Sequence, residues 1–319
     1  MPPSITQINK NAFNGCKKLI YIDIPLSLTS IGESAFKDCQ SMEIILISSS
    51  VSTIGKECFC NCQKLKEVSL PSSLTEISDA LFRRCTSLVS IILPSSLTKI
   101  GGESFSETGL VEVSIPSSVV LIDSCAFSKC SSLVSVNIPD SVATIDGSAF
   151  SKCTSLKSII LPPLINVIRY NLFNGCSALE KVQIPSTVNA FEDSCFEGCS
   201  LLSDVAIPPS LTKIGNASFK DCKSLKELKL PDSLESIGSN AFCDCSSLNQ
   251  ISIPSSITSI PIGSFRRCKS LSAAEIPSSI TSISDYAFDG CSSLVEVSIP
   301  ESTEIKNTSF PPETIVTKY

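Results

Sequence analysis

Seventeen cysteines are the residues of this chain whose type and spacing could do chemistry. The run Cys58–Cys62 carries thiols at its first, third and fifth positions and superficially resembles a metal clip. Structural zinc sites usually take four ligands in paired spacings, and histidine, the other common ligand, is absent from the chain. We therefore expect no metal site and no cofactor.

The lack of histidine also bears on catalysis. Histidine is the commonest general base, and it activates the serine or cysteine of most nucleophilic enzymes. No glycine-rich phosphate loop occurs, and no pair of carboxylates departs from the repeat described below. We predict that the protein is not an enzyme and that it has no catalytic residues.

Charge and hydrophobicity exclude some classes of binding partner. The chain has 25 Lys and Arg against 31 Asp and Glu, a net charge of -6. A nucleic-acid binder needs a basic face, so we expect no nucleic-acid partner. The chain contains no apolar run long enough to span a bilayer, and its first residues do not form a signal peptide. We expect no membrane insertion.

A period of 23 residues governs the whole chain. Phenylalanine recurs thirteen times from Phe13 to Phe288, always at a spacing of 23 except for one spacing of 22 between Phe105 and Phe127. Cysteine follows each phenylalanine by three positions, with Thr108 as the one exception. Columns of proline and serine keep the same step. Such self-similarity is typical of solenoid proteins, in which stacked repeats share one core.

Each column predicts a local structure. The alternating apolar pair Val68 and Leu70 predicts a short strand with one buried face, which Pro71 ends. Gly32–Cys39 places apolar side chains one and three positions apart, and we predict one helical or 3₁₀ turn there in each repeat. Ser73 is expected to hydrogen-bond backbone in its turn. Stacked repeats would then form one parallel sheet.

The cysteine column predicts a ladder of buried, reduced thiols, because free cysteine behaves as a small buried hydrophobe. Disulfides between adjacent coils remain open, since the coil spacing lies within the range for a disulfide. Outside the column, we expect Cys58 and Cys195 to be buried and Cys60, Cys125 and Cys243 to be exposed.

These columns closely resemble the BspA-like, or Treponema pallidum type, leucine-rich repeat family. The resemblance rests on the run Leu-x-x-Ile-x-Ile-Pro-x-Ser-Leu and on the run Ile-Gly-x-x-Ala-Phe-x-x-Cys, of which Ile31–Cys39 is a clean copy. It covers essentially the whole chain. The resemblance implies an α/β leucine-rich repeat solenoid, shaped as a horseshoe or arc. The parallel sheet would line the concave face and the helical or 3₁₀ turns the convex face. We expect one domain over residues 1–319, with 301–319 as a degenerate C-terminal cap.

The outward positions of the predicted sheet give a candidate binding surface. Strand side chains alternate between faces, so two variable columns should point away from the core. Their apolar members gather in the first repeats, and exposed apolar clusters often mark interaction sites. The candidate binding residues are Tyr21, Asp23, Ile44, Leu46, Glu67 and Ile92. The alternatives are simple β-propensity at these positions, or cover by a further N-terminal segment.

Protein recognition is the function that fits these observations. The family resemblance implies a microbial surface or adhesion-type protein that recognises host or cell-surface proteins, and hence a location at the cell surface or outside the cell. The alternative is a cytoplasmic protein-interaction scaffold, which the missing targeting signals and the many reduced thiols favour.

Overall fold

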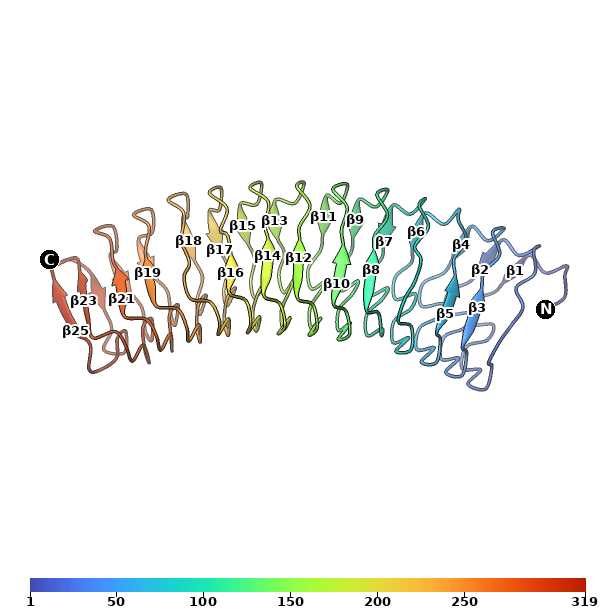
Figure 1. The fold of residues 1–319 in the computed structure, drawn as a ribbon, viewed down its shortest axis with the longest axis horizontal. Helices are drawn as coiled ribbons and strands as arrows, with labels where there is room; N and C mark the ends of the chain where they lie inside the picture. The colour runs from blue at the N-terminus through green and yellow to red at the C-terminus, as the bar shows by residue number, and fades with distance from the viewer. The chain divides into compact units, whose positions relative to one another are not determined.

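The fold is known from a computed structural model that describes residues 1–319. The chain divides into two compact units, Met1–Leu164 and Ile165–Tyr319. Both units are parallel β-solenoids, in which each repeat forms one coil and every strand pairs with the equivalent strand of the neighbouring coil (Figure 1). The predicted parallel repeat fold is confirmed, but most coils carry two strands where the sequence predicted one; residues 21–23, 90–92 and 227–229 form no strand.

The longer strand of each coil arises where the sequence alternates between apolar and variable residues. We call the series of these strands the front sheet. On Ile44–Leu46 the outer residues are exposed and the central Ile45 is buried, as the alternation predicts. Equivalent residues of adjacent coils lie opposite each other, with Ile44 opposite Glu67 and Ile45 opposite Val68. The front strands of unit 1 are β3 (Ile44–Leu46), β5 (Glu67–Ser69), β8 (Glu112–Ser114), β10 (Ser135–Asn137) and β12 (Ser158–Ile160). Those of unit 2 are β14 (Lys181–Gln183), β16 (Asp204–Val205), β19 (Gln250–Ser252), β21 (Ala273–Glu275), β23 (Glu296–Ile299) and β25 (Ile315–Lys318).

A second series of two-residue strands forms the back sheet. Each ends on the isoleucine, or its equivalent, that precedes the phenylalanine by five positions, and this side chain returns to the core in every strand except the last, where Ile305 is exposed. In unit 1 these strands are β1 (Gln7–Ile8), β2 (Ser30–Ile31), β4 (Thr53–Ile54), β6 (Glu76–Ile77), β7 (Lys99–Ile100), β9 (Leu121–Ile122) and β11 (Thr144–Ile145). In unit 2 they are β13 (Val167–Ile168), β15 (Ala190–Phe191), β17 (Lys213–Ile214), β18 (Ser236–Ile237), β20 (Ser259–Ile260), β22 (Ser282–Ile283) and β24 (Glu304–Ile305).

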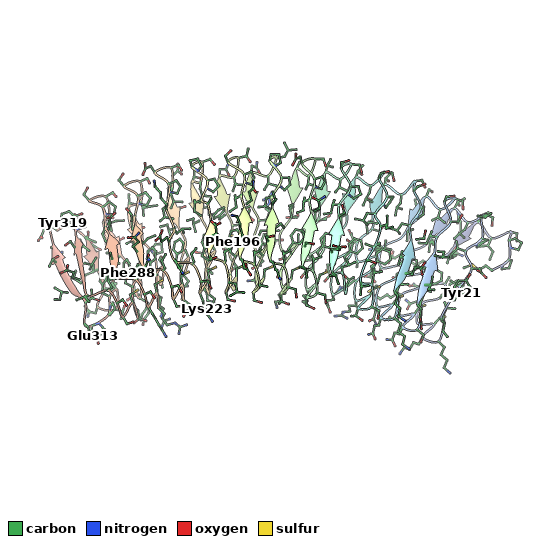
Figure 2. The ribbon with its side chains drawn as sticks, in the orientation of Figure 1. Tyr21, Phe196, Lys223, Phe288, Glu313 and Tyr319 are labelled. Carbon is green, nitrogen blue, oxygen red and sulfur yellow. The ribbon has the colours of Figure 1, made fainter.

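The phenylalanine column is the centre of the core. In unit 2 the rings from Phe173 to Phe310 stack in sequence, with centroids 5.1–5.5 Å apart. Phe196, which Figure 2 labels, belongs to this stack. Unit 1 has the same stack from Phe13 to Phe150, with spacings of 5.1–5.7 Å. Offset stacking of aromatic rings adds to the burial of their apolar area.

Side chains of the serine and cysteine columns join one coil to the next. Ser50 Oγ donates to the carbonyl of Leu28 at 2.7 Å, and Ser233 Oγ donates to that of Leu211 at 2.7 Å. The predicted bond to backbone therefore forms at these serines, but it reaches the preceding coil instead of the serine's own turn. Cys62 Sγ lies 3.2 Å from the carbonyl oxygen of Phe36, and this contact recurs along the column.

The segment around each phenylalanine is not helical, and the prediction of helical or 3₁₀ turns is wrong. The structure contains no helix. In Gly32–Cys39 the residues two before and two after Phe36 are left-handed, Ser34 with φ 54° and Asp38 with φ 61°. Left-handed residues cannot continue a right-handed helix. The backbone N–H groups instead alternate between two kinds of acceptor. Some donate within the coil, such as Cys39 N to Phe36 O at 3.2 Å, and others donate to the next coil, such as Phe36 N to Cys58 O at 2.9 Å.

The left-handed positions predict a stabilising substitution. Ala217 has φ 52°, a conformation that an alanine adopts at a cost and glycine adopts freely. We expect Ala217→Gly to raise the free energy of unfolding by about 0.5–1 kcal/mol. Ala143→Gly is the matched control, because Ala143 is exposed and is not left-handed; it should lower stability by a similar amount. Urea unfolding of both variants measures this, and equal losses in the two would contradict it.

Candidate functional site

Strand β3 presents the two central residues of the predicted surface. The Ile44 side chain is 36% exposed and that of Leu46 is 50% exposed. Both stand beside β5, where Ile44 faces Glu67 and Leu46 faces Ser69 across the ladder. Apolar side chains of this size seldom lie together on a solvated face. The structure therefore brings Ile44, Leu46 and Glu67 into contact range on one surface.

Tyr21 and Asp23 occupy the preceding coil. Tyr21 is exposed, and its hydroxyl donates to Asp23 Oδ1. This hydrogen bond is the main cause of the raised pKa of Tyr21, because the bond and the nearby negative charge both favour the protonated phenol. The coil runs beside β3, since Glu43 N donates to Ile20 O at 3.0 Å (Figure 2). Residues 21–23 do not form a strand.

A groove opens in the front sheet of unit 1 at residues 90–92. These residues form no strand, so β5 pairs only with β3, and β8 pairs only with β10. Ile92 is 87% exposed there. The groove has a volume of about 1020 Å³, and its lining includes Glu67, Ile92 and Glu112. Of the predicted residues, Glu67 and Ile92 thus line one groove, Ile44 and Leu46 adjoin it, and Tyr21 and Asp23 lie outside its lining.

The short fifth repeat lies beside this interruption. The missing residue falls between Thr108 and Leu110, in the turn that leads into β8. Gly109 occupies this turn, and a Cβ atom there would overlap the carbonyl oxygen of Thr86 in the preceding coil. The close approach of the two coils therefore requires glycine.

Gly109→Ala is accordingly expected to lower the free energy of unfolding by about 1–3 kcal/mol, because the backbone of the preceding coil must shift. Gly102→Ala is the matched control, since a Cβ there would meet Ser124 O at an ordinary 3.4 Å. That control should change stability by less than about 1 kcal/mol. Urea unfolding distinguishes the two, and an unchanged Gly109→Ala midpoint would contradict the steric account.

Three valines belong to the same surface and were not predicted from the sequence. Val89, Val111 and Val134 are 52%, 43% and 38% exposed. Their backbones follow one another, with Val111 N donating to Val89 O and Val134 N donating to Val111 O. They precede the first outward column by one position, where most other repeats carry charged or polar residues. Three successive valines in a mostly polar column, which has Ile20 and Val295 at its two ends, were the signal that could have identified them.

Two carboxylates of the groove have no cationic partner. Glu67 and Glu112 make no ion pair and no side-chain hydrogen bond in the structure. The nearby Lys66 is already paired, with its Nζ 3.1 Å from Glu43 Oε2. The groove therefore combines apolar side chains with uncompensated negative charge.

The relation of this chain to known proteins follows from its repeats. Three overlapping stretches, residues 1–110, 75–203 and 193–315, each match the family described as the BspA type leucine rich repeat region (6 copies). The chain belongs to the BspA-type leucine-rich repeat family. The resemblance drawn from the phenylalanine, cysteine and proline columns is confirmed.

Solved structures of leucine-rich repeat proteins share the fold of this BspA-type chain. A leucine-rich repeat protein from Bacteroides ovatus is 31% identical over 98% of this chain and 92% of its own, with a TM-score of 0.65. One from Eubacterium ventriosum is 24% identical over 99% of this chain and 84% of its own, with a TM-score of 0.64. The pneumococcal vaccine antigen PcpA is 21% identical over 99% of this chain and 78% of its own, with a TM-score of 0.58. A search of curated proteins found no match.

The front sheet of unit 2 has a different character. Lys181 and Asp204 form an ion pair at 2.9 Å on the equivalent outward column. A second interruption, at residues 227–229, opens a groove of about 410 Å³ whose lining includes Glu227, Lys229 and Glu275. Charges of both signs line it. The unit 1 groove also includes a cation, Lys66, but this lysine is paired with Glu43.

The cysteines of this BspA-type chain are free thiols. Cys16 is exposed and Cys125 is half-buried, and the other fifteen are buried. The predicted burial of Cys58 and Cys195 is confirmed; the predicted exposure of Cys60 and Cys243 is wrong, because the packing of adjacent coils leaves them only 7% and 6% exposed. No group of three or more potential metal-ligating side chains is present. Burial raises the pKa of Cys130 to about 11, so its thiol is protonated at neutral pH.

No part of the structure is a helix long and apolar enough to cross a bilayer.

Proposed function

We propose that this chain is a non-enzymatic protein-binding solenoid whose binding surface is the front sheet of unit 1, from Tyr21 through Ile44 and Leu46 to the groove at Ile92. The observation that carries the proposal is the cluster of exposed apolar side chains on this face. Such clusters on a folded protein mark interaction sites, and rigid strands hold their side chains in fixed positions for a partner. The surface would bind its partner by apolar contact and would not catalyse a reaction.

The partner in this proposal is a protein at the surface of a host or neighbouring cell, and the chain acts as a microbial surface or adhesion-type protein. Family membership supports this role. The alternative is an intracellular interaction scaffold, which the ladder of buried cysteines supports, because reducing compartments preserve thiols.

Site-specific crosslinking tests the binding surface. A photo-crosslinking amino acid replaces Ser69, which faces Leu46, and the protein is exposed to cell-surface protein extracts. We expect a discrete crosslinked partner that excess unlabelled protein competes away. The Ile44→Ser/Leu46→Ser competitor should fail to compete, because it lacks the apolar anchors.

The matched control competitor is Ala206→Ser/Ala273→Ser, which makes the same kind of change on exposed front-sheet positions of unit 2. It should compete like the unaltered protein. Equal competition by the Ile44→Ser/Leu46→Ser protein would show that the proposed surface does not bind the partner.

A thiol count separates the two cellular roles. Protein from its native source is unfolded in alkylating reagent and the modified cysteines are counted by mass spectrometry. Close to seventeen free thiols would favour the intracellular scaffold. Many blocked thiols would mean disulfides, and would favour the surface role.

A further inference from the structure

The groove of unit 1 reaches the inward side of the front sheet. Val68 and Ile91 belong to the inward column, yet both are only half-buried, whereas the equivalent Ile45 is fully buried. All of the groove's inward residues are apolar, and they include Val113 at 4% exposure. The interruption of the ladder at residues 90–92 thus provides an apolar floor into which a partner's side chain can pack.

The rim of the groove carries negative charge on both sides of the interruption. Glu67 and Glu112 occupy the same outward column, with Ser90 in the coil between them. Two spacings of a continuous parallel sheet come to about 10 Å, and the break in the ladder at residues 90–92 releases β5 and β8 from that spacing. Ile92 projects from the intervening coil in the neighbouring column.

A partner that covered this rim without cations would bury two unpaired carboxylates. Burying an unpaired charge is costly, and a paired, hydrogen-bonded charge avoids most of that cost. Lys66 also lines the groove but is bound to Glu43, so it would have to leave that partner to compensate either carboxylate. The charge of the groove therefore selects a partner that brings its own lysines or arginines.

We propose that the groove binds a basic segment of a protein partner. This segment would place one lysine or arginine side chain on Glu67 and another on Glu112, and an apolar side chain between them against Ile92 and the floor. Alternate side chains of an extended segment share a face, so two cations four positions and about 13 Å apart, with the apolar residue midway between them, can all face the groove. The inference rests on the proposed function, and adds to it the chemistry of the partner. An acidic segment meets like charge at the same rim and is rejected.

Two synthetic peptides of equal length test the proposal. The basic probe has two arginines four positions apart with one leucine midway between them, in a glycine-serine context with blocked ends. The acidic probe replaces both arginines with glutamate. Fluorescence anisotropy with the full chain should show at least tenfold tighter binding of the basic probe, with an affinity that falls as salt rises. Equal binding of the two probes, or binding of neither, would overturn the proposal.

Variants of the chain locate the interaction. Glu67→Gln/Glu112→Gln removes the charge with little change in shape, and should weaken binding of the basic probe at least tenfold. Glu275→Gln/Glu296→Gln is the matched control, since these are exposed carboxylates on the front sheet of unit 2. It should leave binding unchanged. Circular dichroism and urea unfolding check that both variants fold. Loss of binding in the control alone, or in neither variant, would overturn the assignment.

The crosslinking experiment distinguishes this inference from the proposed function. Suppose that the Ile44→Ser/Leu46→Ser protein no longer binds the partner captured at position 69, whereas the Glu67→Gln/Glu112→Gln protein still binds it. The inference of a basic segment is then wrong, and the proposed binding surface is supported. If both variants keep the partner, both proposals are wrong. If both lose it, and the basic probe competes for the site, both are supported.

Discussion

Replacement of Phe242 by alanine is expected to lower the free energy of unfolding by about 3–5 kcal/mol. Phe242 is fully buried and stacks between Phe219 at 5.5 Å and Phe265 at 5.3 Å. Backbone hydrogen bonds on both sides of the ring fix the spacing of the coils, so the neighbours cannot move together to fill the space. The variant therefore loses both the buried area of the ring and its stacking contacts.

Urea unfolding followed by circular dichroism measures this loss, with Phe13→Ala as the control. Phe13 is half-buried and stacks on one ring, Phe36, at 5.1 Å. Its removal should cost about 1 kcal/mol, since less apolar area returns to water. A similar loss in the two variants would mean that the position of a ring in the stack does not affect its contribution.

Alkaline pH is expected to destabilise the fold steeply. Burial raises the pKa of Cys130 from 9.0 to about 11, and it raises the pKa of Cys85, Cys199 and Cys245 as well. Above pH 9 these thiols lose protons in the unfolded chain but keep them in the folded one. The unfolded state then binds fewer protons, so stability falls as pH rises. The contribution is present in full below pH 9, and for Cys130 it is lost as pH rises through about 11.

Cys130→Ala isolates the effect of one thiol. The variant is less stable than the unaltered protein at pH 7, because the alanine leaves a small cavity. The difference should shrink by about 2 kcal/mol between pH 8 and pH 11, because only the unaltered protein loses the contribution of this thiol. Val142→Ala removes buried volume without a titratable group, so its difference should stay constant. If the free energy of unfolding of Cys130→Ala and that of the unaltered protein fell in parallel as pH rises, the prediction would be contradicted.

The phenylalanine and cysteine columns allowed most of the fold to be predicted. A residue type that returns every 23 positions must occupy the same environment in every coil, and a large apolar one must be buried. The alternation around Ile45 and Val68 likewise predicted strands, because only a period of two places their neighbours on the opposite face. The candidate residues Ile44 and Leu46 followed from the same alternation.

The turns around phenylalanine could not be predicted from spacing. Ala35, Phe36 and Cys39 have the one-and-three spacing of a helical turn, but successive turns with left-handed residues bury the same side chains. The choice between them depends on where Phe36 N donates, and its acceptor, Cys58 O, lies in another coil. The second, short strand of each coil escaped prediction for the same reason, because two residues give no periodicity.

The sequence by itself determined the repeat, the family, the parallel coils and which columns face the core, because each of these follows from side-chain type at a fixed period. Only the tertiary structure decided that Ser90–Ile92 would leave the ladder, that Val89, Val111 and Val134 would join the surface, and that Glu67 and Glu112 would stay unpaired. Hydrogen bonds and ion pairs between coils join residues about 23 positions apart, and no local pattern in the sequence specifies whether they form.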